Sequence, residues 1–322
     1  MGDTLAIAVA NLLSPMVLFF ALGFGAALLR SDLVVPEAIA KGLALYLMLA
    51  IGFKGGAGIA ESGVGAHVAA ALIAGLVLSL AIPVIAYALL RAATGLPRVD
   101  AAAVAAHYGS ISIVTFVAAT EALRMFGVPF GGYMVAVAAV MEAPAIVVAL
   151  WLAGRGGDTQ DGAPAWREVL LNGSVVVLIG AFAVGWITGP SGLAEIAPFI
   201  VDPFKGVLCL FLLDMGLVAA RGLLQGAKAL QPRLIAFALV MPVLGAVLGG
   251  VAARLIGLDT GSAAILMTLA ASSSYIAVPA AMRIALPEAR PAIYLTLSLC
   301  ITFPFNLTVG IPLYLAAAQW VG

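Results

Sequence analysis

Long apolar runs follow one another along the whole sequence, and they restrict what this chain can fold into. A helix needs about 20 apolar residues to cross the ~30 Å hydrocarbon core of a bilayer. The alternation of apolar and polar residues that an outer-membrane barrel requires is absent from the sequence. We therefore predict an all-α polytopic membrane protein with ten transmembrane helices, one for each run: 12–29, 35–53, 66–90, 100–123, 131–153, 168–188, 199–219, 233–256, 260–286 and 291–319.

The composition supports this class and excludes several others. Apolar residues make up 64% of the 322 residues and charged residues 9%, too few charges to cover the core of a soluble chain. The 15 basic and 15 acidic residues cancel, so we expect no nucleic-acid partner. The two cysteines, Cys209 and Cys300, lie inside apolar runs, which argues against a disulfide scaffold or a cysteine metal site. We expect no resident cofactor or metal. We expect the lipid membrane to surround the protein.

The basic residues are distributed unevenly between the connecting segments. Eleven of the 15 follow odd-numbered runs and four follow even-numbered runs. Because positively charged loops stay in the cytoplasm, we expect both termini outside and the loop 154–167 inside. We place the protein in the bacterial inner (plasma) membrane.

The two halves of the sequence match each other at an offset of about 164 residues. Lys41-Gly42-Leu43 is followed by Gly52, and Lys205-Gly206-Val207 is followed by Gly216 at the same distance. Two further matches lie in the same order: 109–112 with 272–275, and 141–144 with 301–304. Chance similarity between apolar segments is the alternative to a duplication. With five runs in each half, a duplication gives copies of opposite orientation, the inverted-repeat plan of secondary transporters. We predict three segments: a first five-helix repeat at 1–155, a cytoplasmic linker at 156–166 and a second, inverted five-helix repeat at 167–322.

Serine-rich stretches interrupt the fourth and ninth runs at positions that correspond under the repeat. The fourth run contains Gly109-Ser110-Ile111-Ser112, and the ninth contains Ser272-Ser273-Ser274-Tyr275 followed by Pro279. Proline cannot continue a helix but suits its first turn. We therefore expect the ninth helix to break near 273–278, and Gly109 permits a matching break in the fourth helix.

Two such breaks predict an anion site. Broken helices are tolerated at membrane depth only where they line a protein cavity. Each half-helix N-terminus presents free N–H groups and roughly half a positive charge, and serine hydroxyls add donors without net charge. The alternative is that the serines bond back to carbonyls of their own helix or allow helices to pack closely.

Ionisable residues inside the apolar runs are the second signal, because burying a charge in a membrane is costly. Glu142 lies two residues before Pro144, which frees a backbone carbonyl one turn earlier, so this pair suits Na⁺ or a carried proton. A hydrogen-bonded structural glutamate is the alternative. For Lys54 and Asp214 we predict a structural ion pair near the pseudo-twofold axis. His107, one turn before Ser110, fits a packing residue better than a ligand.

These motifs together resemble a known family. From Ser14-Pro15 to Gln319, the chain is similar to the sodium-dependent bicarbonate transporter family known from cyanobacteria. The motifs that carry the resemblance are Pro36-Glu37, Ile51-Gly52-Phe53-Lys54-Gly55-Gly56, Met141-Glu142-Ala143-Pro144, Ala270-Ala271-Ser272-Ser273-Ser274 and Ile311-Pro312-Leu313.

The resemblance implies an architecture and an activity. It implies a core domain at 66–153 plus 233–319, a gate domain at 12–60 plus 168–224, Na⁺-coupled bicarbonate uptake, and a homo-oligomer that in the family is usually a homotrimer. It places the anion between the half-helices, with sodium beside it. The residues that it assigns to the anion are Gly109, Ser110, Ser112, Thr115 and Ser272–Ser274.

The sequence also departs from the family pattern. Tyr275 stands where that pattern has an aspartate, Ile113 and Val114 replace small residues, and Glu142 stands in place of an aspartate. The loss of an acid at Tyr275 removes a candidate sodium ligand or changes the charge of the site. The short loop 154–167 gives no support for a PII-like regulatory partner.

We expect a secondary active transporter rather than an enzyme, working by alternating access on Na⁺ and bicarbonate or a similar small anion. The alternatives are a proton-coupled or organic-carboxylate transporter, favoured by Tyr275 and His107 near the break, and a receptor or scaffold without transport. A serine-protease elbow and a metal-ligand motif are absent from the sequence. The residues predicted for the substrate are Gly109, Ser110, Ser112, Thr115, Ser272, Ser273, Ser274 and Tyr275, and those for sodium or proton coupling are Glu142, Ser274 and Thr115.

Overall fold

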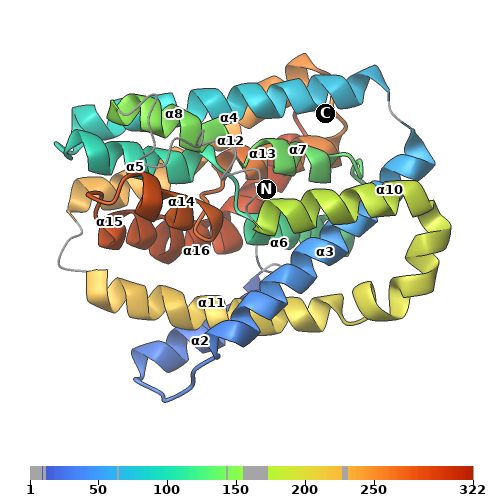
Figure 1. Cartoon of the computed structure of the whole chain (residues 1–322), viewed down its shortest axis with the longest axis horizontal. Helices are drawn as coiled ribbons and strands as arrows, with labels where there is room; N and C mark the ends of the chain where they lie inside the picture. Colours follow the sequence, from blue (N-terminus) through green and yellow to red (C-terminus); the bar gives the residue numbers. More distant parts are fainter. Residues whose placement is uncertain are drawn as a thin grey trace.

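The computed structural model describes residues 9, 12–63, 65–142, 144–154, 173–226 and 231–321. These residues form helices and no strand (Figure 1). Where the structure describes them, the predicted apolar runs coincide with a helix or an interrupted helix; the predicted linker 156–166 and the start of the sixth run lie outside the described residues. Within the described part of the chain, eight segments are long and apolar enough to cross a membrane, and two shorter apolar helices, α2 and α13, have 14 and 12 residues. The all-α membrane class is confirmed, whereas the count of ten crossings and the inverted repeat stay predictions.

The helices of the described residues follow one another along the chain. Their bounds are α2 Pro15–Leu28, α3 Glu37–Ser62, α4 Ala66–Ala93, α5 Arg98–Gly109, α6 Ile113–Met125, α7 Met134–Val140, α8 Pro144–Ala153, α10 Gly173–Ile200, α11 Phe204–Gly226, α12 Pro232–Leu255, α13 Thr260–Ala271, α14 Ala277–Ala285, α15 Pro291–Leu295, α16 Phe303–Phe305 and α17 Ile311–Ala318. Two π-helical stretches, Thr296–Thr302 and Asn306–Gly310, join α15 to α16 and α16 to α17.

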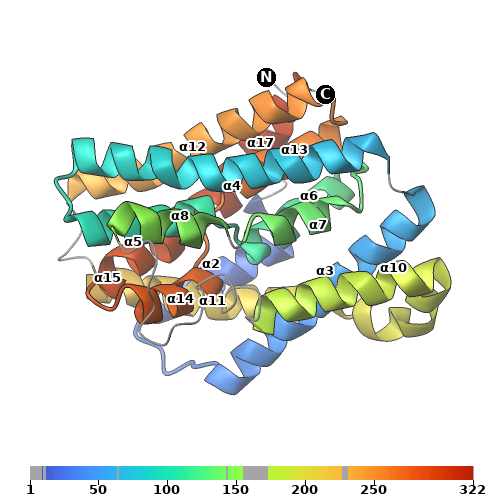
Figure 2. The same cartoon turned by 45° about the horizontal axis from the view of Figure 1, so that its top comes forward.

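Two groups of helices pack side by side. In one group α3 lies along α10 and α11 lies along α2; in the other, α4 and α12 lie side by side, with α5, α8 and α13 against them (Figures 1 and 2). Nearly all of the interrupted segment Arg98–Met125 is buried, whereas most of α10 is exposed. The interior of the bundle is therefore built around α5, α6 and α13. The division into core and gate domains stays a prediction.

Among the described residues, three helices are interrupted inside the bundle, and α10 is in addition kinked at Gly189. The fourth run breaks between Gly109 and Ile113, and the ninth breaks between Ala271 and Ala277, with Pro279 in the first turn of α14 as the sequence predicted. A third interruption separates Val140, the end of α7, from Pro144, the start of α8, because the ring of Pro144 cannot continue the helix.

The contact between α3 and α10 depends on the absence of a side chain at Gly56. A Cβ added there would lie 2.6 Å from the Trp186 nitrogen and closer still to the Phe182 carbonyl oxygen. Small residues at such contacts let membrane helices approach closely and gain dispersion energy. Gly42 lies on the exposed part of the same helix, where an added Cβ would meet nothing within 4 Å.

We predict that Gly56→Leu destabilises the protein by about 1–3 kcal/mol or more, because the leucine must force α3 and α10 apart. The thermal unfolding midpoint in detergent micelles, followed by fluorescence-detected size exclusion, measures this effect. Gly42→Leu is the matched control and should leave the midpoint within about a degree or raise it, since leucine favours helix over glycine. Equal midpoints for the two variants would contradict the close contact.

Candidate functional site

The two predicted helix breaks meet each other through reciprocal hydrogen bonds. The Ser274 N–H donates to the His107 carbonyl oxygen at 2.8 Å. In return, the Ser112 N–H donates to the Ser272 hydroxyl at 3.0 Å. Groups that are 160 or more residues apart therefore satisfy each other's backbone, as buried polar groups must. The structure brings the two serine-rich stretches of the sequence together at one place.

Three of the predicted hydroxyls form hydrogen bonds with backbone groups of the protein itself. Ser112 is the N-cap of α6 and accepts from the Thr115 N–H at 3.2 Å. The Ser274 hydroxyl accepts from the Val278 N–H in the first turn of α14 at 3.5 Å. Ser272 donates to the Leu269 carbonyl oxygen at 2.8 Å. For these three side chains, the structural alternative of capping and back-bonding holds.

Four other hydroxyls around the breaks are buried and unpaired. Ser110, Thr115, Ser273 and Tyr275 are each 7% exposed or less, and their side-chain oxygens have no hydrogen-bond partner among the described residues. A buried polar group without a partner costs roughly 1–3 kcal/mol, so such groups call for an explanation. A bound polar ligand would provide one.

A small cavity lies where the three interruptions converge. It has a volume of about 10 Å³, room for about one water-sized species. Its lining comes from the break between α5 and α6 with Ser112, the break between α7 and α8 with Glu142, the break between α13 and α14 with Ser274 and Tyr275, and from Met48 of α3. The N-terminal residues of α6 and α14 also line it, so two positive helix ends lie beside one carboxyl group.

The oxygen atoms around this cavity are those that a hard cation prefers. Glu142, 7% exposed, Ser112 and Ser274 are among its lining residues, whereas the unpaired Ser110, Thr115 and Ser273 are not. Of the coupling residues predicted from sequence, Glu142 and Ser274 are thus brought together, whereas Thr115 is absent from this lining. The described residues contain no cluster of three or more His, Cys, Asp or Glu side chains that could hold a resident metal.

Gly109 contributes its backbone rather than space for a ligand. A Cβ at this position would lie 2.5 Å from Pro83 Cδ and 2.8 Å from Ala145 Cβ, so α4 and α8 close over it. Its carbonyl oxygen, freed where α5 ends, accepts from the Ser79 hydroxyl at 3.0 Å. The glycine therefore permits the break and the close packing around it.

Ser79 is a site residue that sequence reasoning missed. It is fully buried on α4, and its hydroxyl reaches both the Gly109 carbonyl oxygen at 3.0 Å and the Met141 carbonyl oxygen at 2.9 Å. One hydroxyl proton is thus shared between carbonyls at two different helix breaks. The sequence signal for this residue is weak, because it is a single serine inside a long apolar run. The sequence does not indicate which groups the serine hydroxyl contacts.

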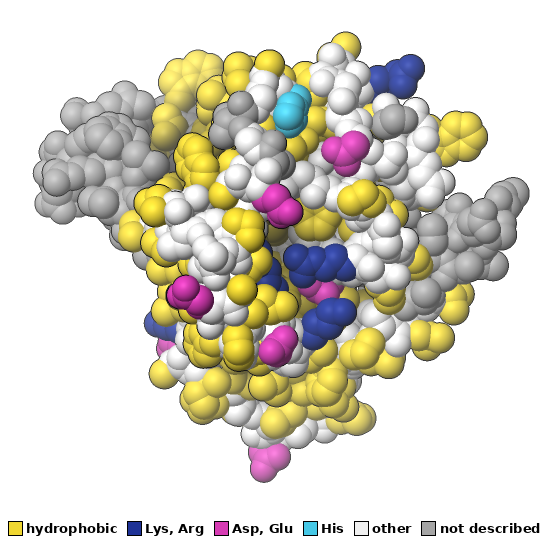
Figure 3. All heavy atoms as spheres, turned by 90° about the vertical axis from the view of Figure 1, so that its right-hand side faces the viewer, with side chains coloured by type: hydrophobic (Ala, Val, Ile, Leu, Met, Phe, Trp, Pro, Cys, Tyr) yellow, Lys and Arg dark blue, Asp and Glu magenta, His cyan; other side chains and the backbone are white. Residues whose placement is uncertain are grey.

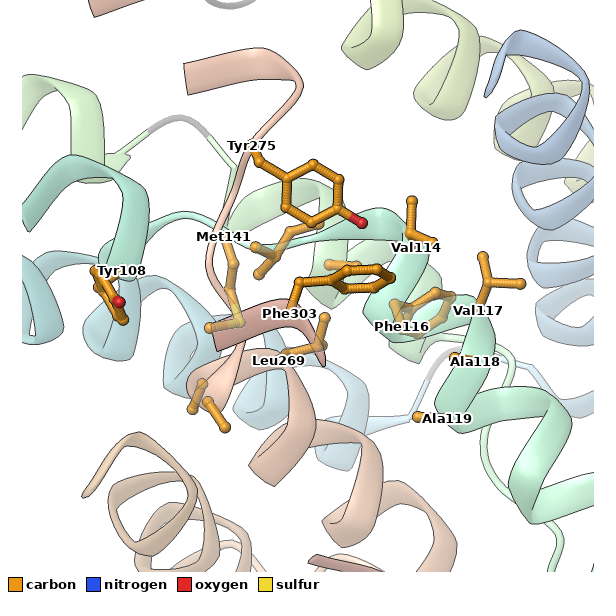
Figure 4. Close-up of a cluster of buried hydrophobic side chains, with 14 of the residues drawn as sticks. Tyr108, Val114, Phe116, Val117, Ala118, Ala119, Met141, Leu269, Tyr275 and Phe303 are labelled. Carbon is orange, nitrogen blue, oxygen red and sulfur yellow. The ribbon is translucent and has the colours of Figure 1, made fainter. Parts of the chain in front are cut away.

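The aromatic rings of Tyr275 and Phe303 pack against each other beside the site. Their centroids are 5.1 Å apart, and Figure 4 shows the Tyr275 hydroxyl pointing toward Val114 of α6, with Phe116 and Val117 beyond it. Tyr275 also lines the small cavity, together with Ser112, Glu142 and Ser274. His107 packs as expected: Nδ1 lies 2.6 Å from the Ala103 carbonyl oxygen, and its ring stacks on Tyr294 at 4.5 Å.

The predicted ion pair between Lys54 and Asp214 is not formed. The Lys54 ammonium lies over the Phe204 ring, 3.9 Å from its centroid. Asp214 lies ten residues further along α11, about 15 Å at the rise of a helix, and its charged neighbour is Arg221. The repeat placed both residues near the pseudo-twofold axis, but it could not give the register in which α3 packs against α11.

A comparison with known protein families identifies one match. The family described as the Na⁺-dependent bicarbonate transporter superfamily matches residues 15–319, nearly the whole chain. No curated protein matches the chain.

We predict that Ser79→Ala destabilises the protein by about 1–3 kcal/mol, because two buried carbonyl oxygens lose their shared donor. Ser298→Ala is the matched control: that hydroxyl is also buried but donates to carbonyls of its own helical segment, at 2.7 Å for Tyr294. Thermal unfolding in detergent should separate the two variants by several degrees. A Ser79→Ala midpoint equal to that of Ser298→Ala would mean that the bridge between the breaks contributes nothing.

Proposed function

Because the chain belongs to the Na⁺-dependent bicarbonate transporter superfamily, we propose that it is a secondary active transporter that carries Na⁺ and bicarbonate together across the membrane. The observation that carries this proposal is the convergence of three helix breaks on one small cavity that contains the Glu142 carboxyl group. Interrupted helices at membrane depth are the usual construction of transporter binding sites.

The anion is held between the half-helices. The N-terminal ends of α6 and α14 offer free N–H groups and partial positive charge, and the unpaired hydroxyls of Ser110, Thr115 and Ser273 can each donate a hydrogen bond to a bicarbonate oxygen. With no lysine or arginine among these groups, binding is weak enough to allow release on the other side. Gly109, Ser112 and Ser272 act by shaping and capping the two breaks, and Ser274 both caps α14 and lines the cavity.

The cation is held beside the anion by oxygen ligands. Glu142 and Ser274 supply two of them, and Tyr275, in place of an acid, keeps the count of negative charges low. Each ion offsets the charge of the other, so the loaded site crosses the bilayer at lower cost than either ion alone. This mutual compensation is the physical basis of coupled transport here.

Access alternates when one group of helices moves against the other. Met48 of α3 lines the small cavity from the group formed by α2, α3, α10 and α11, whereas the other lining residues come from the interrupted helices. Displacement of α3 therefore opens or closes the site on that wall. We further propose ten crossings in two inverted repeats, with a gate at 12–60 plus 168–224 and a core at 66–153 plus 233–319. Both termini lie outside the inner membrane, and the protein forms a homo-oligomer.

A proton-coupled or organic-carboxylate transporter is the second candidate. It is favoured by one observation: the acid of the family pattern is replaced by Tyr275, whose hydroxyl is buried and unpaired within the described residues. A pH-sensitive dye trapped in vesicles distinguishes the two, since proton-coupled uptake acidifies the lumen without a sodium gradient.

We expect purified protein in liposomes to take up ¹⁴C-labelled bicarbonate when Na⁺ is outside and not when choline replaces it. Glu142→Gln should reduce Na⁺-driven uptake by more than about tenfold, because the cation loses the charge of its ligand. Glu37→Gln is the matched control, since Glu37 is exposed and pairs with Lys41 on the surface. Absence of Na⁺-dependent uptake in the unaltered protein would overturn the proposed function, and full activity of Glu142→Gln would overturn the cation site.

Ser273→Ala tests the anion site separately. We predict that it lowers the maximal rate divided by KM for bicarbonate about tenfold, the loss of one hydrogen bond to a charged group. Its control is Thr268→Val on α13, one turn before the break, where the hydroxyl donates to the Ala264 carbonyl oxygen of its own helix. Undiminished transport by Ser273→Ala would place the anion elsewhere.

A further inference from the structure

A second, larger cavity lies next to the site, between α3 and α11 on one side and α6 and α7 on the other. Its volume is about 340 Å³, roughly ten times the share of one water molecule in the liquid. Lys54, Gly55, Phe116, Thr120, Arg124 and Phe204 are among its lining residues. A partly hydrated small ion fits into such a space.

Positive charge predominates around this cavity. Arg124 lies 2.7 Å from the Glu121 carboxylate and Lys205 lies 3.5 Å from it, and both belong to the group that interacts electrostatically with Lys54. Three cations therefore surround a single carboxylate. Figure 3 shows Lys and Arg side chains near the middle of one face of the molecule, with Asp and Glu side chains around them.

Of these three cations, Lys54 is the one that is available to bind an anion. It is half-buried, and among the described residues no carboxylate lies within ion-pair distance of its ammonium group. It rests instead on the Phe204 ring, a weaker partner that orients the group without neutralising it. Burying a lysine in this way is costly unless an anion compensates it for part of the time.

The larger cavity leads toward the helix breaks. Ile51 of α3 and Phe116 of α6 line the larger cavity, and Met48 and Ile113, three residues earlier on the same two helices, line the small one. Three residues correspond to about 4.5 Å along a helix. The two cavities are thus about one helical turn apart along both walls.

We propose that the cavity around Lys54 is an entry site for small monovalent anions, which attracts bicarbonate and passes it to the helix breaks. This inference rests on the proposed function. The entry site carries the formal charges that the transport site lacks: Lys54, with Arg124 and Lys205, raises the local concentration of the anion, and the nearly neutral breaks then bind it for translocation. Under the proposed orientation, this cavity opens to the outside.

Transport kinetics give the first test. Lys54→Gln should raise the apparent KM for bicarbonate roughly fivefold, more than it lowers the maximal rate, as expected for the loss of about one unit charge near a solvated site. Lys54→Arg should keep the KM near its original value. Lys41→Gln is the matched control, because this lysine lies on the same helix but is exposed and paired with Glu37. An unchanged KM in Lys54→Gln would overturn the proposal.

Chemical rescue shows whether charge at this position is the cause. Lys54→Cys should have a raised KM, which treatment with aminoethyl methanethiosulfonate lowers again by restoring an ammonium group. The neutral methyl methanethiosulfonate should not lower it. The parent protein, whose Cys209 and Cys300 are both buried, is treated in parallel to measure background reaction. Equal rescue by the two reagents would contradict a role for charge.

A measurement without transport separates this proposal from the proposed function. In detergent, with each rate divided by that of the same reagent with a free small thiol, Lys54→Cys should react several-fold faster with an anionic sulfonatoethyl reagent than with a cationic trimethylammonium reagent, and Arg124→Gln in the same background should reduce that ratio. Sodium bicarbonate should slow the reaction relative to sodium gluconate. If these results hold while the vesicles show no Na⁺-dependent uptake, the function fails and the anion cavity stands. If uptake is seen but the two reagents react equally, the cavity proposal fails alone.

Discussion

The structure depends on the pairing of backbone groups that three interrupted helices leave free inside a membrane protein. Neither lipid nor bulk water satisfies those groups, so each break needs a partner. The Ser274 N–H donates a hydrogen bond to the His107 carbonyl oxygen, and the Ser112 N–H donates one to the Ser272 hydroxyl. The Ser79 hydroxyl donates to carbonyl oxygens at two breaks. These bonds hold the breaks against each other, and they require α5, α6 and α13 to occupy the interior of the bundle.

The same arrangement of helices places the basic side chains away from the proposed transport site. The breaks contain hydroxyls, helix ends and one carboxyl group, that of Glu142, while Lys54 and Arg124 line the neighbouring cavity, with Glu121 and Lys205 paired behind Arg124. A site with fixed cations would bind an anion strongly but release it slowly. In the function that we propose, a nearly neutral site next to a positively charged entrance attracts the anion and still lets it leave.

Much of the fold could be predicted from sequence because lipid imposes simple rules. Apolar runs gave the helices, Gly109 and Pro279 marked two of the breaks, and the match between the serine-rich stretches indicated that these breaks belong together. The ion pair of Lys54 with Asp214 was wrong, since the repeat places residues only to within several residues along a helix. The ten crossings, the inverted repeat and the domain division stay predictions.

The sequence by itself determined the class of protein, the positions of two helix breaks and the chemistry of the groups near them, because these follow from local residue types and from the cost of exposing polar groups to lipid. Only the tertiary structure decided which hydroxyls cap a helix and which are left unpaired, that Ser79 joins two breaks, and that Lys54 faces a cavity rather than Asp214. Those outcomes depend on the register between helices that are far apart in the chain, and packing alone sets that register.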